Sequence, residues 1–274
     1  MSINITYTAS SGNVYDLMAD KAIRTKTANY HKWSWGVVKT SQQFGDNVTG
    51  FTRAGSVYTT KLMFRGTYAA NKTQIENLHE DFELDIYNRT PGTIQWGDYY
   101  VRCFITASST YPDDNNRTVN DIEIYCPYPF WQKDVKRSFQ VQSGGGGQGL
   151  DYDYDYDYDY AEDASGDEVW APGTNLPSEY TMIIYGAATD PVVTINGSQF
   201  GAYATLLAGD YLTIDSRNHT VTKTANDGTV TNLFDYRLKN ESIFNRIPGG
   251  SLSITWSGLF AFDLILHTER SEPR

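Results

Sequence analysis

A single amphipathic helix, predicted in a chain whose other patterns are strand-like, most constrains what this protein can fold into. Over residues 71–86, apolar side chains recur at spacings of three and four, which places them on one face of a helix. The apolar positions are Ile75, Leu78, Phe82 and Ile86, and the polar positions opposite them are Glu76, Asn77, Glu80 and Glu83. For the amino-terminal cap the sequence offers two pairs, Asn71 with Gln74 or Thr73 with Glu76. Because one helix of this length cannot bury its own apolar face, we expect it to lie across a sheet in an α+β unit.

Strand-like segments lie on both sides of the predicted helix. Residues 30–38 and 57–64 are rich in aromatic and β-branched side chains, which favour strands. Between them lie residues typical of loops, namely Gly45, Asn47, Gly50 and Gly55. After the helix, Gly97-Asp98 separates residues 93–96 from 99–107, and such a pair is typical of a tight hairpin turn. A further strand is predicted at 121–126, where apolar and polar residues alternate.

Two closely spaced prolines mark the expected end of a first domain. In the motif Cys126-Pro-Tyr-Pro-Phe-Trp131 the prolines force an extended, unpaired chain. We therefore predict domains at 1–133 and 134–274. The second contains only short strand patterns, with hairpin turns at Asn196-Gly197 and Asp227-Gly228, which favours a β-sandwich. The predicted fold class is mainly β with one amphipathic helix.

An acidic segment at 151–168 begins with an alternation of aspartate and tyrosine. It holds nine acidic residues and no basic one, so the rest of a chain with net charge −11 is close to neutral. Carboxylate oxygens suit cations such as calcium. The candidates for a cation or partner contact are Asp151, Asp153, Asp155, Asp157 and Asp159. The alternative is an exposed strand or loop whose aspartates keep it soluble and block edge pairing.

The sequence contains no pattern of catalytic, metal or cofactor residues. Its four histidines form no close metal-ligand pair, no serine lies in a G-x-S-x-G elbow, and no phosphate-binding glycine loop is present. We therefore predict no catalytic residue, metal or cofactor, and a protein that is not an enzyme. No cluster of Lys and Arg predicts nucleic-acid binding, and no stretch approaches the roughly 18 apolar residues that would predict membrane insertion.

Two residue types leave alternatives open. Cys103 and Cys126 lie in strand-like runs, so buried free thiols are expected, with a disulfide as the alternative. Trp170 and Trp256 could contact a glycan by stacking, or they could be core aromatics.

The order of these features resembles the distal tail proteins of siphophages and related phage-like particles. The matching stretches in the first half are the strand 30–38, Phe64-Arg65-Gly66, the helix end at 80–86, the hairpin strand 97–103 and the proline motif 126–131. In the second half they are Ile184-Tyr-Gly186, 191–196, 207–215 and 244–249. Each stretch is short and unspecific, and their shared order carries the resemblance.

This resemblance implies an architecture and a role. An N-terminal domain would assemble into a homo-hexameric ring, and a C-terminal galectin-like β-sandwich would project outward. In the family, the ring joins the tail tube protein to the tail tip or baseplate and anchors tail-associated lysin or receptor-binding proteins, while DNA passes through its lumen without being read. The protein would be a virion component assembled in the host cytoplasm. Two alternatives are a carbohydrate-binding adhesion module and, supported by context alone, a cell-wall hydrolase.

Overall fold

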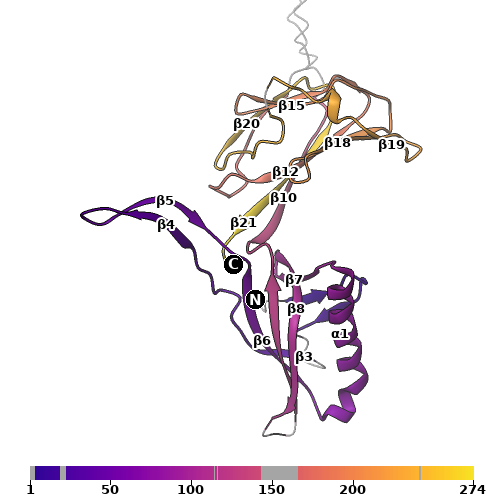
Figure 1. The fold of residues 1–274 in the computed structure, drawn as a ribbon. Coiled ribbons are helices and arrows are strands. Elements are labelled where there is room, and N and C mark those ends of the chain that lie inside the picture. The colour runs from indigo at the N-terminus through magenta and orange to yellow at the C-terminus, as the bar shows by residue number, and fades with distance from the viewer. Residues whose placement is uncertain (1–3, 19–22, 114, 116, 143–165, 241) are drawn as a thin grey trace, which may run out of the picture. The chain divides into compact units, whose positions relative to one another are not determined.

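A computed structural model describes residues 4–18, 23–113, 115, 117–142, 166–240 and 242–274. These residues form a mainly β fold with a single α-helix, which confirms the predicted fold class. They divide into two compact units, unit 1 (Met1–Lys133 with Glu269–Arg274) and unit 2 (Asp134–Thr268) (Figure 1). The chain passes from one unit to the other within β10 (Trp131–Phe139) and again within β21 (Phe262–Arg270). This division differs from the predicted domain 134–274, because Glu269–Arg274 belongs to unit 1.

Unit 1 is built on an antiparallel sheet in the order β2-β1-β7-β8-β9-β6-β3. Its strands are β1 (Ile5–Thr8), β2 (Val14–Asp16), β3 (Ile23–Ala28), β6 (Ser56–Phe64), β7 (Gly92–Trp96), β8 (Tyr99–Pro112) and β9 (Thr118–Cys126). Strand β8 is shared: its first residues pair with β7 across the predicted Gly97-Asp98 turn, and the rest pair with β9. Cys103 and Cys126 are both buried and free.

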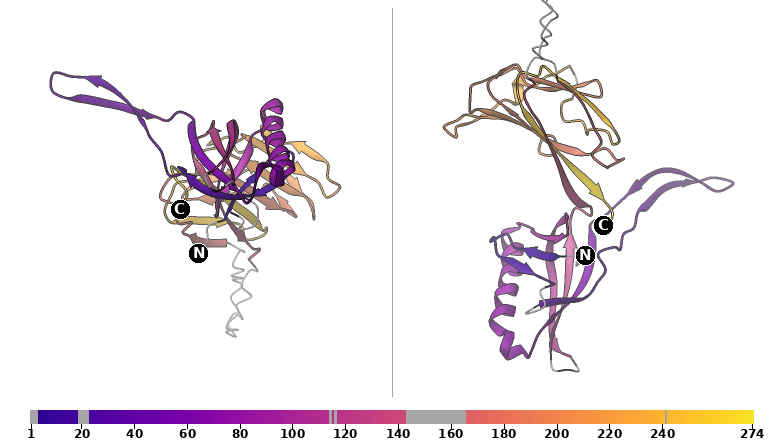
Figure 2. Two further views of the ribbon diagram at one scale, coloured as in Figure 1. Left: turned by 90° about the horizontal axis from the view of Figure 1, so that it is seen from below. Right: turned by 180° about the vertical axis from the view of Figure 1, so that it is seen from behind.

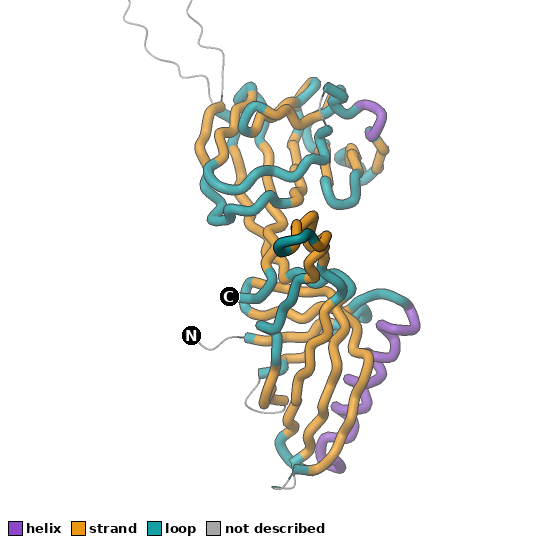
Figure 3. Tube along the Cα trace, turned by 60° about the vertical axis from the view of Figure 1, so that its left-hand side comes forward, coloured by secondary structure: helices purple, strands orange, loops and turns teal. Residues whose placement is uncertain are grey.

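Helix α1 (Tyr68–Asn88) lies along this sheet (Figure 3). It begins three residues earlier than predicted, because Thr67 is the cap: its hydroxyl accepts a hydrogen bond from the Ala70 N–H. Three of the four predicted core residues, Ile75, Leu78 and Phe82, are buried, whereas Ile86 is 46% exposed. The prediction was therefore wrong about Ile86, because the preceding residue, Asp85, is the one that faces the sheet.

Two buried carboxylates tie α1 to the first hairpin of the sheet. Asp85 accepts hydrogen bonds from the Tyr7 hydroxyl and from the Ser10 N–H. Asp81 accepts hydrogen bonds from three side chains, those of Ser11, Asn13 and Tyr15. Since a buried carboxylate is tolerated only when it is hydrogen-bonded, these contacts fix the helix in one position on the sheet.

Unit 2 consists of two larger sheets that enclose one apolar core, together with the short two-stranded sheet β13-β16. One has the order β19-β18-β17-β12 followed by the unit 2 parts of β21 and β10, and the other has the order β11-β20-β14-β15. The bounds are β11 (Gly166–Trp170), β12 (Glu179–Tyr185), β13 (Ala188–Thr189), β14 (Val192–Ile195), β15 (Ser198–Gly201), β16 (Thr205–Leu206), β17 (Tyr211–Asp215), β18 (Thr220–Thr224), β19 (Val230–Asn232), the 3-10 turn η1 (Phe234–Tyr236) and β20 (Leu252–Trp256). As predicted, Asn196-Gly197 forms a two-residue hairpin turn, between β14 and β15, with both residues at positive φ.

Candidate assembly surface

A two-stranded hairpin, which we call the arm (residues 36–52), projects from the rest of unit 1 (Figures 1 and 2). It consists of β4 (Gly36–Ser41) and β5 (Asp46–Thr52), which pair with each other and with no other described strand. Nearly every residue of both strands is exposed. An isolated two-stranded hairpin is at best marginally stable in water, so the arm is a segment that needs a covering partner.

The arm corrects part of the sequence prediction. Gly45, Asn47, Gly50 and Gly55 were expected to lie in loops, and the preceding strand was expected at residues 30–38. Gly45, with a φ of +82°, lies in the turn of the arm and Gly55 lies in the loop after it, whereas Asn47 and Gly50 pair within β5 opposite Thr40 and Val38. Strand β5 was not predicted because it contains Asn47 and Gly50, two residue types that are typical of loops.

One face of the arm is apolar although it is exposed. Val37 pairs with Phe51 and, beyond a register shift after Val38, Lys39 pairs with Val48, so three apolar side chains and Lys39 lie on this face. At the tip, Phe44 is 87% exposed. Exposed apolar residues are common singly, but a contiguous exposed apolar face indicates an interaction site.

The root of the arm is held by aromatic and charged side chains of unit 1. The guanidinium of Arg53 lies 4.7 Å from the centre of the Phe130 ring and 5.6 Å from that of Trp35. Its Nη1 donates a hydrogen bond of 2.7 Å to Oγ of Ser271. Residues 53, 130 and 271 are far apart in the sequence, so this contact joins three segments beneath the arm and sets its direction.

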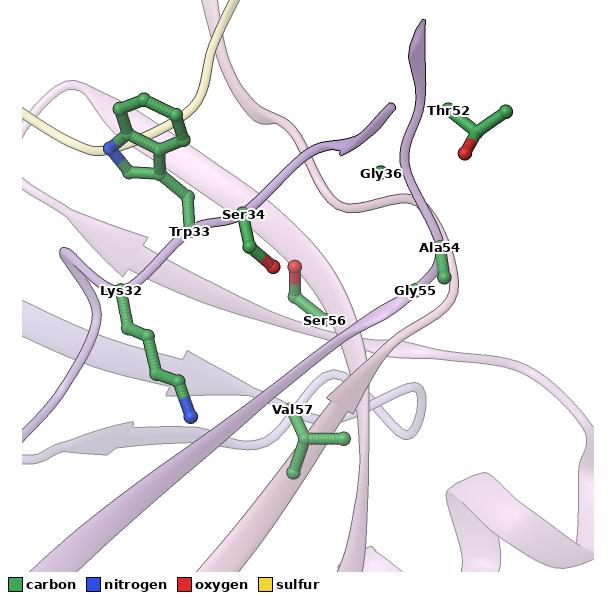
Figure 4. Close-up of a pocket in the computed structure, with 9 residues that line it drawn as sticks. All are labelled: Lys32, Trp33, Ser34, Gly36, Thr52, Ala54, Gly55, Ser56 and Val57. Atoms are coloured by element: carbon green, nitrogen blue, oxygen red, sulfur yellow. The ribbon is translucent and has the colours of Figure 1, made fainter. Parts of the chain in front are cut away.

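A cavity of about 320 Å³ opens beside this root (Figure 4). It is lined by Lys32, Trp33, Ser34, Gly36, Thr52, Ala54, Gly55, Ser56 and Val57. The hydroxyls of Ser34 and Ser56 face one another across it, and Lys32 is its one ionisable residue. The cavity thus combines two hydroxyl groups and one cationic side chain beside the root of the arm.

Helix α1 lies on the flank of unit 1 opposite the arm (Figure 2), and it carries a second exposed apolar area. We call it the helix groove, and it lies on α1. Its lining residues are Glu80, Glu83, Leu84, Ile86 and Tyr87. Tyr87 is 86% exposed, which is almost the same as Phe44 at the arm tip. Unit 1 therefore presents apolar side chains on two opposite flanks.

The residues predicted to contact a glycan lie elsewhere. Trp170 and Trp256 are 7% and 5% exposed, and both rings pack edge-on against Phe139 in the core of unit 2. The indole N–H of Trp256 donates to the backbone oxygen of Phe260 at 3.1 Å. Of the two alternatives that the sequence left open for these residues, the structure supports core aromatics, because the two rings fill the space between two sheets.

The acidic candidates are not placed by the structure. Asp151, Asp153, Asp155, Asp157 and Asp159 lie outside the described residues. Among the residues that are described, no group of three His, Cys, Asp or Glu side chains could hold a metal ion. No helix in that part of the chain is long and apolar enough to cross a membrane.

One side-chain series in unit 2 resembles hydrolase machinery and was missed in the sequence. His267 lies between Asp134, at 2.7 Å from Nδ1, and Thr181, at 2.9 Å from Nε2. However, Thr181 is in the middle of β12, which pairs with β17 on one side and β21 on the other. The backbone amides next to Thr181 therefore donate hydrogen bonds within the sheet, so they cannot form an oxyanion hole. The series ties strands together.

Comparison with known proteins identifies the fold. No family model and no curated protein matches this sequence. Among solved structures, the crystal structure of the Dit protein of phage SPP1, described as a paradigm of hub adsorption apparatus in phages infecting Gram-positive hosts, matches with a TM-score of 0.65. The match covers 97% of this chain and 98% of SPP1 Dit at 10% identity. A chain of the phage P2 baseplate in its activated conformation with Ca matches with a TM-score of 0.62 at 11% identity, covering 100% of both chains. At such low identity the likeness establishes the fold, which is that of these hub and baseplate proteins over nearly the whole chain.

Proposed function

We propose that this protein is a structural subunit of a phage tail tip, a distal tail protein that assembles into a homo-hexameric ring. The observation that carries the proposal is the near-complete coverage of SPP1 Dit and of the phage P2 baseplate chain. The ring joins the tail tube protein to the tip or baseplate and anchors adhesion or lysin proteins in the virion.

The arm supports assembly on physical grounds. Fully burying a Val or Phe side chain contributes roughly 1.5–3 kcal/mol. Val37, Val48 and Phe51 are each exposed at about half of their surface or more, and Phe44 is nearly fully exposed. Covering these four residues with a neighbouring subunit would therefore add several kcal/mol to each interface, on the order of what a specific contact needs after entropy losses.

The charge of the chain fits a passage for DNA. Outside the segment 151–168 the chain is close to neutral. A basic lumen would hold DNA through counterion release, so a near-neutral ring is better suited to let DNA through. The partner of the acidic segment stays a prediction.

An enzymatic role has no positive support. Among the described residues, the series Asp134–His267–Thr181 lies within a sheet, where the strand of Thr181 is paired on both sides. The carbohydrate-binding alternative rested on Trp170 and Trp256, and both are core residues. We therefore propose a scaffold without chemistry of its own.

The mass of the purified full-length protein tests this function. Light scattering coupled to size exclusion, over a range of protein and salt concentrations, should reveal a species of six subunits, and negative-stain images should show rings with sixfold symmetry. The measurements are repeated with the tail tube protein, since a ring can require a partner to close. A protein that stays monomeric in every one of these conditions would contradict the proposal.

A further inference from the structure

The two cysteines of the chain lie opposite each other on neighbouring strands of the unit 1 sheet. Ile105 of β8 pairs with Ile124 of β9, and two steps further in the same register Cys103 lies opposite Cys126. Residues two apart point to the same face of a strand, so both thiols lie on the face that Ile105 and Ile124 occupy. Both cysteines are 0% exposed and belong to the core of unit 1. The fold thus brings the only two thiols of the protein together.

The backbone geometry at this pair meets the requirement of a disulfide. Directly opposite residues of an antiparallel pair have Cα atoms about 4.5–5.5 Å apart, and disulfides join residues whose Cα atoms are usually about 4.4–6.8 Å apart. The thiols are also in contact, because a hydrogen bond to Cys126, together with burial, raises the pKa of Cys103 well above its ordinary value. The two sulfur atoms can therefore be joined without a rearrangement of either strand.

The folded sheet protects this pair from reagents in solution. A thiolate attacks, not a thiol, and the raised pKa of Cys103 keeps its thiol protonated. Cys126 is the last residue of β9 and is followed by Pro127, so the pairing of that strand ends at Cys126. The end of a strand opens more readily than its middle. The reaction of the pair therefore begins at Cys126, during a local opening of the strand end.

We propose that Cys103 and Cys126 are a modification site, at which a small-molecule disulfide oxidises the two thiols to a bond that joins β8 to β9. The thiolate of Cys126 attacks one sulfur of the reagent, which forms a mixed disulfide and releases the other half as a thiolate. Cys103 then attacks the sulfur of Cys126, forms the internal bond and releases the second half. The protein thiols lose two electrons to the reagent, and their two protons end on the released thiols.

The bond acts as a staple in the middle of the unit 1 sheet. Strands β8 and β9 are flanked by β7 and β6, so the bond joins two inner strands. It also holds the end of β9, after which the chain enters β10 and passes to unit 2. A cross-link restricts mainly the unfolded chain, so oxidation stabilises unit 1. A virion subunit passes from a reducing cytosol to an oxidising medium, in which the bond forms, although the chemistry itself does not depend on that role.

Thiol counting on the full-length protein tests the staple. Reduced protein is incubated with oxidised glutathione under native conditions, then quenched with acid, denatured, alkylated and weighed by mass spectrometry. The expected product carries no alkyl group and lacks both thiol hydrogens. Trypsin cleaves after Arg102, Arg117 and Lys133, so a digest without reductant should contain residues 103–117 and 118–133 as one linked species. A denaturing gel without reductant should show a single chain, which excludes a bond between copies.

The melting temperature of unit 1 is the second readout. Oxidation should raise it by roughly 5–10 °C, and a reductant should reverse the change. Cys103→Ala and Cys126→Ala are the matched controls, because each keeps one thiol and can form only a mixed disulfide with glutathione. Circular dichroism checks that both variants fold, and neither should gain stability from the oxidant.

Two results would overturn the staple. One is that both thiols are still alkylated after incubation, in native buffer and equally at urea concentrations just below the unfolding transition, where local opening is frequent. The other is an internal bond that leaves the melting temperature unchanged or lowers it, because the native register would then not suit the bond. Ring formation is measured separately on reduced protein, so a failure to assemble would remove the proposed ring and leave the staple in place.

Discussion

Replacing Tyr7 with phenylalanine tests how α1 is held on the sheet. Tyr7 is 1% exposed, and its hydroxyl donates to Asp85, which is fully buried. The variant keeps the ring, which packs edge-on against Phe82 at 5.2 Å, and deletes only the donor. A hydrogen bond to a charged group contributes roughly 1.5–3 kcal/mol, and its loss leaves a buried carboxylate oxygen unsatisfied. We therefore expect Tyr7→Phe to lower the free energy of unfolding of unit 1 by about 2 kcal/mol.

Urea unfolding measures this loss. For a slope of about 2 kcal/mol per molar, the midpoint of the unit 1 transition should fall by about 1 M. Because a chain with two units need not unfold in one step, hydrogen exchange of the α1 amides is measured in parallel to assign the change to unit 1. Tyr68→Phe is the control, since Tyr68 begins the same helix and is about half exposed. Equal midpoints for the two variants would refute the reasoning, because the Tyr7–Asp85 bond would then contribute nothing.

Three further predictions concern acid stability, the arm root and the core of unit 2. Burial acts to raise the pKa of Asp81, but hydrogen bonds from Tyr15, Ser11 and Asn13 outweigh it and hold that pKa below its ordinary value. The resulting stabilisation is present above the unfolded pKa of about 3.9 and is lost as the pH falls through the lower folded pKa, so urea midpoints between pH 6 and pH 2.5 should drop less for Asp81→Asn than for the unaltered protein. Arg53→Ala should speed hydrogen exchange in residues 36–52 while α1 stays protected, and unchanged exchange in the arm would show that the Arg53 contacts do not hold its root. Trp256→Ala should lower the melting temperature of unit 2 through a loss of about 3–5 kcal/mol, whereas the half-exposed Trp33→Ala should change stability by less than about 1 kcal/mol.

Local patterns made part of the fold predictable from sequence. The periodicity of Ile75, Leu78 and Phe82 predicts a helix because the repeat depends only on neighbouring residues. The turns at Gly97-Asp98 and Asn196-Gly197 were predictable for the same reason, since Gly97, Asn196 and Gly197 adopt positive φ angles that most residues disfavour. The extra helical turn before Asn71 was missed, because Tyr68, Ala69 and Ala70 are helix-compatible but carry no apolar periodicity.

The candidate site was largely invisible in the sequence. Among the described strands, the two strands of the arm pair only with each other, so no pattern in a neighbouring strand predicts them. In addition, Asn47 and Gly50 within β5 favour the prediction of a loop. Burial of Trp170 and Trp256 depends on how two sheets face each other, which no local pattern specifies. The burial of Asp85 was also missed, because it depends on a hydrogen bond from Tyr7, a residue that is far away in the sequence.

Residues 269–274 complete unit 1 although they follow all of unit 2 in the chain. During synthesis the ribosome must finish the second unit before Ser271 can reach Arg53 beneath the arm. The first unit to emerge is thus the last to be completed, and a prematurely terminated product would carry an arm without that anchor.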